Sequence, residues 1–242
     1  MKKIKKYLLS ETALNSLTTG DSQSGNFDKC LKDNQVTTWL FLHENEMKYL
    51  HQFNIDKLNY CGFLTEPYLL FLDQANNLAA KSGIIKKSLK FNIVNEFDVK
   101  ENFKLSLLNQ EIFDDYLIMK INFTVFAVMS LECYLNNLLP DKIIFNGYDK
   151  KIIEHKFSIK QKISEIIPTF KIIDNIRNFQ QKYSEVLKLV ELRNNLVHLK
   201  TKEVNMLDSN IKHFETILKL DAKKEFLKVS SLINLIDSLP YS

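Results

Sequence analysis

The stretch INFTVFAVMSLECYLNNLLP, residues 121–140, decides the fold of this chain. Apolar side chains cover nearly the whole circumference of a helix drawn through it, which is typical of a central helix packed by neighbours on several sides. We predict a helix from about Leu107 to Leu139 that ends at Pro140. The polar residues within the stretch, Glu132 above all, favour a core helix over a membrane span.

Capping residues and apolar residues at helical spacing predict further helices on both sides of this one. They cover about 65–80, a short segment with a Ser158 and Gln161 capping-box pattern before Pro168, a segment from 176 capped by Asp174, 208–220 and 223–239. Alternating or β-branched runs predict strands at about 36–42 and 88–98. We therefore expect a mainly α fold, with an α+β accessory region over residues 1–100 and a helical domain over residues 101–242.

Composition narrows the class of protein. Apolar residues make up 45% and charged residues 26%, which fits a folded globular chain. The 5 glycines and 4 prolines leave little turn chemistry for a many-stranded sandwich or barrel. A net charge of +4 argues against a polybasic binding mode and leaves a local basic groove open. The 3 cysteines are widely spaced and form no CxxC pair, so we expect no zinc site and reduced thiols in a cytoplasmic protein. Polar residues from Ser10 to Asn15 interrupt the apolar content of the N-terminus, so we expect no signal peptide.

Arg193 breaks a regular pattern. The predicted helix from 176 carries an apolar stripe at Ile176, Phe179, Tyr183, Val186, Val190 and Val197, and its spacing calls for an apolar residue at 193. The chain uses lysine almost everywhere, and its only arginines are Arg177 and Arg193. An arginine retained at such a position indicates a need for its planar fork of donors, and it must be paired or face a cleft.

Asn194 and His198 lie one helical turn apart, and Arg193 is next to them in the sequence. The run RNNLVH, residues 193–198, resembles the Arg-polar-(x)-His signature of HEPN domains (higher eukaryotes and prokaryotes nucleotide-binding). The segment Met129–Pro140 is similar to the long HEPN helix that carries an acidic residue and an asparagine, here Glu132 and Asn136. The likeness covers roughly residues 105–240.

The resemblance implies a helical bundle that cleaves RNA, as HEPN toxins and antiviral defence nucleases do. It implies catalytic roles for Arg193, Asn194 and His198, supporting roles for Glu132 and Asn136, and a homodimer with a composite site. A possible antitoxin or regulatory protein is a further expected partner. The chemistry suits these residues, because a base that is neutral near pH 7 and a cation on the phosphate allow attack by the RNA 2′-hydroxyl without a metal or other cofactor.

Three structural alternatives stay open at this stage. Arg193 can form an ion pair with Glu132 that only holds two helices together. His198 can serve as a favourable charge near a helix C-terminus. Glu132 can be solvated, and otherwise needs Arg193 or His198 as its partner. At the level of function, the alternatives are a non-catalytic HEPN-like module that binds RNA, a nucleotide or a protein, and a helical scaffold without a site.

Overall fold

The computed structural model describes residues 5–6, 38–43, 46–55, 58–100, 103–197 and 204–241, with side chains described within 65–97, 104–197 and 211–241. The described chain is mainly α-helical, as predicted. It divides into two units, Met1–Glu66 and Pro67–Ser242, and each is taken by itself here. The described part of the first unit contains a four-stranded sheet in the order β1-β2-β3-β4, in which only β1 and β2 are parallel. Its strands are β1 (Lys5–Lys6), β2 (Thr38–His43), β3 (Glu46–Ile55) and β4 (Leu58–Leu64).

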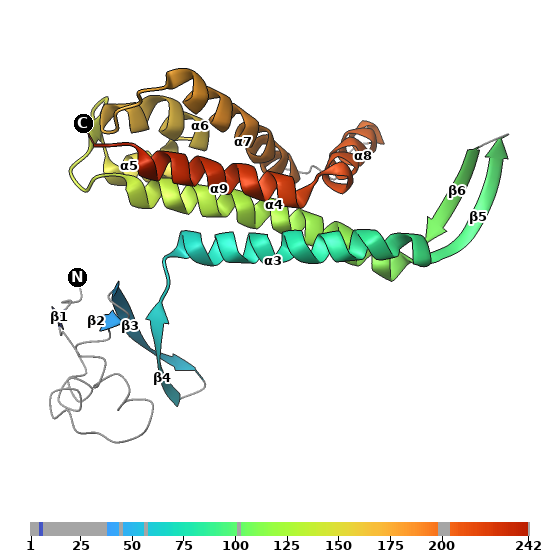
Figure 1. Cartoon of the computed structure of the whole chain (residues 1–242), viewed down its shortest axis with the longest axis horizontal. Helices are drawn as coiled ribbons and strands as arrows, with labels where there is room; N and C mark the ends of the chain where they lie inside the picture. Colours follow the sequence, from blue (N-terminus) through green and yellow to red (C-terminus); the bar gives the residue numbers. More distant parts are fainter. Residues whose placement is uncertain are drawn as a thin grey trace. The chain divides into compact units, whose positions relative to one another are not determined.

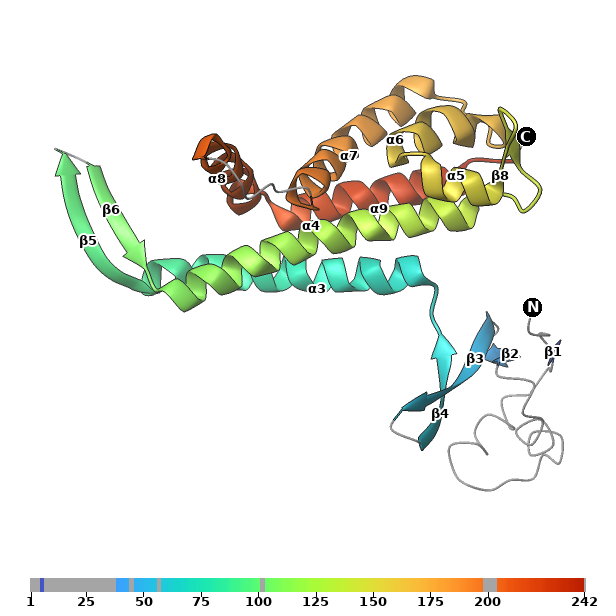
Figure 2. The ribbon, with the colours of Figure 1, turned by 180° about the vertical axis from the view of Figure 1, so that it is seen from behind.

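The second unit is a helical bundle with one long hairpin. Its elements are α3 (Pro67–Ser88), η1 (Leu89–Phe91), β5 (Ile93–Lys100), β6 (Phe103–Leu108), α4 (Gln110–Leu138), β7 (Ile144–Phe145), β8 (Tyr148–Asp149), α5 (Lys150–Lys156), α6 (Ile159–Gln161), η2 (Lys162–Ile166), η3 (Ile167–Thr169), α7 (Ile176–Val197), α8 (Val204–Lys219) and α9 (Ala222–Ser238). Figures 1 and 2 show α3 and α9 running alongside α4, with α5, α6 and α7 together on one side.

The division between the units lies at residue 66, whereas the sequence analysis placed it near residue 100. The difference is α3, which packs along α4 and contributes Ala75 and Ala79 to the same buried cluster as Phe123 and Val128. Small residues on α3 allow this close approach. Residues 67–100 therefore belong with the helical bundle rather than with an accessory region.

The long helix α4 is the centre of the bundle, as its sequence predicts. Asn109 caps it by accepting a hydrogen bond from the backbone N–H of Ile112. By length and composition α4 could also cross a membrane. Its second half is nevertheless packed in the core, where Phe123, Ala127 and Leu131 are fully buried and α3, α7 and α9 all contact the helix. This is the arrangement of a core helix in a bundle.

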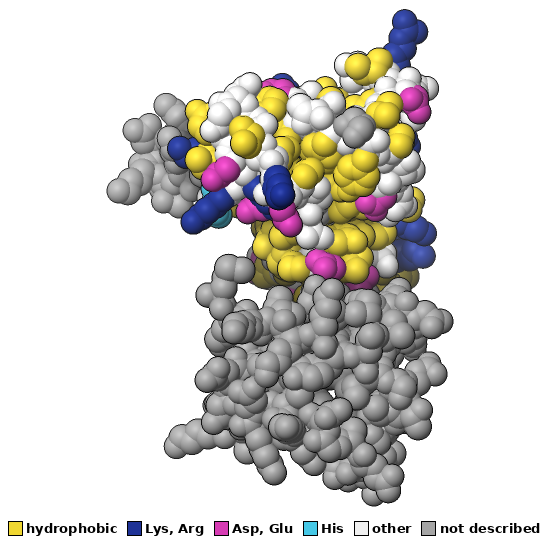
Figure 3. Space-filling model, turned by 90° about the vertical axis from the view of Figure 1, so that its left-hand side faces the viewer, with side chains coloured by type: hydrophobic (Ala, Val, Ile, Leu, Met, Phe, Trp, Pro, Cys, Tyr) yellow, Lys and Arg dark blue, Asp and Glu magenta, His cyan; other side chains and the backbone are white. Residues whose placement is uncertain are grey.

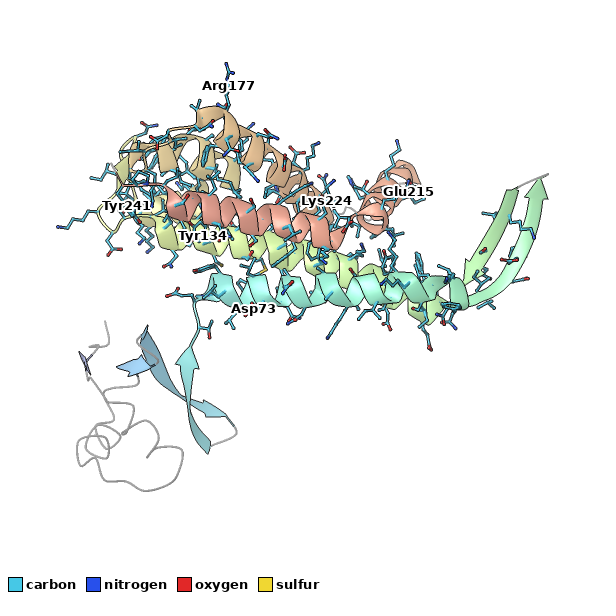
Figure 4. The ribbon with its side chains drawn as sticks, in the orientation of Figure 1. Asp73, Tyr134, Arg177, Glu215, Lys224 and Tyr241 are labelled. Carbon is cyan, nitrogen blue, oxygen red and sulfur yellow. The ribbon has the colours of Figure 1, made fainter. Side chains whose placement is uncertain are left out.

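Tyr134 fastens α4 to two neighbours (Figure 4). Its hydroxyl donates to Oδ1 of Asp237 on α9 at 2.6 Å, and its ring meets that of Tyr68 on α3 edge-on, with the centroids 5.4 Å apart. Burial and the hydrogen bond to Asp237 raise the pKa of Tyr134 well above its ordinary value, because both favour the neutral phenol. Tyr134 therefore links α4 to α3 and α9 and stabilises the bundle.

Local signals set most helix ends. Ser158 and Gln161 form the predicted capping box of α6, with each side chain accepting from the other's backbone N–H. The predicted Asp174 cap of α7 is wrong, because Oδ1 of Asn175 accepts from the backbone N–H of Asn178 at 3.0 Å. In α3, the predicted end near Gly83 is also wrong. The helix runs to Ser88 because Ile85 and Ser88 continue its partly buried face, and a single glycine is tolerated inside a helix.

Buried lysines donate hydrogen bonds to backbone carbonyls at the C-terminal ends of three helices in the described bundle. Lys171 Nζ donates to the backbone oxygen of Leu239, just beyond α9, at 2.8 Å. Lys120 Nζ donates to the backbone oxygen of Leu220, just beyond α8. Lys162 Nζ donates in the same way to Glu154 in the last turn of α5, at 2.9 Å. The unpaired carbonyls of a helix end favour a cation, and this chain uses its abundant lysine for the purpose.

Candidate functional site

Arg193 lies near the end of α7, at the point where the apolar stripe of that helix is interrupted. Its Nη2 donates to Oε2 of Glu132 on α4 at 2.9 Å. Of the two partners predicted for Glu132, Arg193 makes this contact. Phe179, Val186 and Val190 of the stripe are buried, whereas its two end members, Ile176 and Val197, are 58% and 60% exposed. The Arg193–Glu132 pair therefore stands where the core ends.

The pair is open to solvent on one side. The side chain of Arg193 is 21% exposed and that of Glu132 is 40% exposed. Partly exposed ion pairs contribute about 0–1 kcal/mol to stability, so holding the fold together is a minor role for this contact. Its main physical effect is to fix the direction of the guanidinium. Nε of Arg193 is buried and has no hydrogen-bond partner within the described residues.

Asn136 lies one turn after Glu132 on α4, and it too is held by a cation from another element. Lys162 Nζ donates to Oδ1 of Asn136 at 2.6 Å. Lys162 is 1% exposed and begins the π-helical turn η2, a type of turn that is frequent at functional sites. Burial lowers the pKa of Lys162, while the carboxylates of Glu132 and Glu154 oppose that shift. Glu132 thus forms an ion pair with Arg193 and interacts electrostatically with Lys162.

Lys162 is the member of this site that the sequence analysis missed. The sequence feature that reveals Lys162 is the same one that revealed Arg193. Both are basic residues at positions where a helical pattern calls for an apolar residue. Ile159, Ile163 and Ile166 surround it at spacings of three, one and four residues, and all three are buried. The same test applied to the short segment after Ser158 would have found it.

The exposed end of α7 carries the rest of the predicted motif. Asn194 and Asn195 are exposed, and α7 ends at Val197. His198 lies outside the described residues. The structure therefore brings together Arg193, Glu132, Asn136 and Lys162, and it leaves Asn194 beside Arg193 on the surface of the helix.

The other arginine has a different environment. Arg177, in the first turn of α7, is exposed and points away from the bundle (Figure 4). It forms no ion pair with any described residue. On the end of the bundle shown in Figure 3, acidic and basic side chains are mixed among apolar ones, with no field of one sign on that face. Arg193 is therefore the arginine that the fold positions.

Comparisons with known proteins add no assignment. No protein-family model, no curated protein and no solved structure matches the chain.

Lys162→Met is expected to destabilise the bundle by about 1–3 kcal/mol, because Oδ1 of Asn136 and the carbonyl of Glu154, both on half-buried residues, lose the donor that a buried lysine supplies. Urea unfolding of the variant beside Lys160→Met, an exposed neighbour on α6, measures this cost. The difference should widen in alkali. Burial lowers the folded-state pKa of Lys162, so the unfolded chain binds that proton more tightly and the wild type gains stability as pH rises toward 10.5. Equal costs for both variants would contradict the buried network.

Proposed function

We propose that the helical unit is a metal-independent endoribonuclease of the HEPN type, a toxin or antiviral defence effector that cleaves single-stranded or loop RNA as a homodimer. The observation that carries the proposal is the Arg193–Glu132 contact at 2.9 Å. It supports the proposal because a carboxylate from the central helix orients an arginine that stays partly open to solvent. Sealing the pair in the core would cost desolvation free energy, whereas a partly exposed guanidinium keeps donors available for a phosphate.

The proposed reaction uses side chains and the substrate alone. His198 removes the proton of the RNA 2′-hydroxyl, whose oxygen attacks the adjacent phosphorus. The bond from phosphorus to the 5′-oxygen breaks, and the partner's His198 returns a proton to that oxygen. The products are a 2′,3′-cyclic phosphate and a 5′-hydroxyl. Arg193 binds the non-bridging phosphate oxygens, where negative charge develops, and Asn194 offers an amide to the same phosphate.

Glu132, Asn136 and Lys162 have supporting roles in this proposal. Glu132 holds Arg193 by one nitrogen, and the positive charge of Lys162 also interacts with that carboxylate. One hydrogen bond of the five that a guanidinium can donate leaves other donors of Arg193 available. This arrangement favours an arginine that keeps its direction and can still exchange part of its contact for a phosphate.

Cleavage is expected to survive chelation, because no step of the proposed reaction uses a metal ion. Purified protein would be incubated with single-stranded RNA in EDTA, and the fragments resolved on a denaturing gel against the same reaction in Mg²⁺. The cleavage rates should agree within about twofold, a difference far smaller than the effect of losing a catalytic group. Loss of cleavage in EDTA with rescue by Mg²⁺ would assign the chemistry to a different class of nuclease.

The second candidate function is a non-catalytic module that binds RNA, a nucleotide or a protein through the same surface. The observation in its favour is that Arg193 already donates to Glu132, which is also what a structural contact would look like. Binding of RNA without the appearance of cyclic-phosphate ends would favour this function. In that case Arg193 and Asn194 should still matter for affinity.

A further inference from the structure

The hairpin β5–β6 extends from the ends of α3 and α4, beyond the rest of the helical unit (Figures 1 and 2). Its register gives it two different faces. Phe97 pairs with Leu105, and Leu107 lies on the same face, whereas Glu96 pairs with Ser106 on the other. Phe97, Leu105 and Leu107 are 48%, 49% and 51% exposed. One face of the hairpin is therefore apolar and open to solvent.

A sheet of this kind is incomplete by itself. A two-stranded hairpin is marginally stable in water, and three or more strands with a covered apolar face are needed for independent stability. Within the described residues β5 and β6 form a sheet of two strands without a third. Additional strands would therefore stabilise the hairpin and extend its apolar face.

The two free edges of the hairpin are not equivalent. The ladder shifts register twice along β5, between Ile93 and Asn95 and between Asp98 and Lys100, while the paired residues of β6 follow one another without a break. Bulges and charged residues are the devices by which proteins protect a strand edge from pairing, and β5 has both. The regular edge of β6, with the sequence FKLSLL, has no bulge and a single charged residue, Lys104, whereas β5 carries Glu96, Asp98 and Lys100. It is the edge that is ready to pair.

We propose that β6 pairs antiparallel with β6 of a second copy of this chain, forming a four-stranded sheet in the order β5-β6-β6-β5. The strand is complementary to itself in one register. With Leu105 opposite Leu105 of the second copy, Lys104 lies opposite Ser106 and Leu107 lies opposite Phe103. A shift of one pair in one direction places Lys104 opposite Lys104, and a shift in the other places it opposite Leu108. Like charges directly opposite are destabilising, and a lysine opposite a leucine loses the polar partner that Ser106 offers, so the first register is favoured over both shifts.

A second copy fits this edge better than a nucleic acid does. The polar face of the hairpin carries Glu96 beside Ser106, and the edge of β6 presents a single lysine, so no basic track follows the strand. Two-fold pairing is also closed, because it uses the β6 edge of each copy and leaves the protected β5 edges outside. The contact uses no residue of the proposed catalytic site. In the proposed homodimer one two-fold axis relates both the β6 strands and the two composite sites, and β6 pairing is the contact that holds the copies together. Pairing at β6 does not require that the chain cleave RNA.

Sedimentation of the full chain tests the pairing directly. The wild type is expected to sediment at about twice the chain mass of 28.4 kDa. Leu105→Lys places like charges opposite each other at the centre of the pairing and should halve the measured mass. Leu227→Lys, at a leucine of α9 that is 57% exposed, should leave the mass unchanged. Circular dichroism checks that both variants stay folded. A monomeric wild type, or a Leu105→Lys variant that keeps the wild-type mass, would overturn the proposal.

Cysteine cross-linking tests the register. Under mild oxidation Leu105→Cys is expected to form a disulfide-linked dimer that thiol reduction reverses, beyond the background that the native cysteines give in the wild type. Leu227→Cys serves as the matched control and should stay at that background. Equal cross-linking of the two variants would contradict pairing at β6. Because His198→Ala leaves the hairpin intact, that variant should remain a dimer whether or not the chain cleaves RNA.

Discussion

Replacing His198 with alanine is expected to reduce RNA cleavage by about 10²- to 10⁴-fold, the usual contribution of a general base or acid. The helical circular dichroism signal and the thermal midpoint should stay close to those of the wild type, because the residue follows α7 in the sequence and Val197, the last residue of that helix, is 60% exposed. Initial cleavage rates on one single-stranded RNA, measured at equal protein concentration, give the comparison.

His155→Ala is the matched control for that experiment. His155 is an exposed histidine in the last turn of α5, so its replacement removes an imidazole from the surface without touching the motif at 193–198. It should cleave like the wild type. If His198→Ala retains activity within twofold of the wild type, the catalytic assignment is wrong and weight moves to the binding module.

Arg193→Lys is expected to lower cleavage by about 10²-fold or more, although it keeps the positive charge. A lysine can bind Glu132 or the phosphate, but a single ammonium cannot make two parallel hydrogen bonds to phosphate oxygens while the carboxylate holds it. Because the Arg193–Glu132 pair is partly exposed, the free energy of unfolding should change by about 0–1 kcal/mol. The substitution should therefore lower the cleavage rate and leave the stability of the fold nearly unchanged.

Arg177→Lys makes the same substitution at the other arginine of the chain. That side chain is exposed at the start of α7, so the variant should cleave at the wild-type rate. A normal rate for Arg193→Lys as well would mean that the cation acts only through its charge, and the argument from the planar guanidinium would fail.

The features that the sequence predicted correctly were those set by residues close together in the chain. The apolar circumference of 121–140 predicted the central helix α4, and the Ser158 and Gln161 spacing predicted the capping box of α6. Arg193 was found because a charge replaced an expected apolar residue, and its partner followed from the same reasoning applied to Glu132. Burial penalises an uncompensated charge, so a charged residue in an apolar pattern carries information about a distant partner.

What the sequence did not reveal depended on contacts between segments. The division at residue 66 follows from α3 packing on α4, which alanines of α3 allow and which no pattern within residues 1–100 indicates. The strand β6 was not predicted, because it has only six, mostly apolar residues, and the helix predicted from Leu107 overlapped its last two. Asn175 replaced Asp174 as a cap because two capping residues stood side by side, and only the path of the chain decides between them.

The mechanism is tested most directly by removing one oxygen from the substrate. Once a cleavage position has been mapped in a short RNA, the same RNA is made with a single 2′-deoxynucleotide on the 5′ side of the scissile phosphate. In EDTA, the wild type should leave that position uncut while it cuts the all-ribose RNA to fragments with 2′,3′-cyclic phosphate and 5′-hydroxyl ends. Cleavage of the deoxy-substituted position at an undiminished rate would contradict attack by the 2′-hydroxyl, and with it the role given to His198.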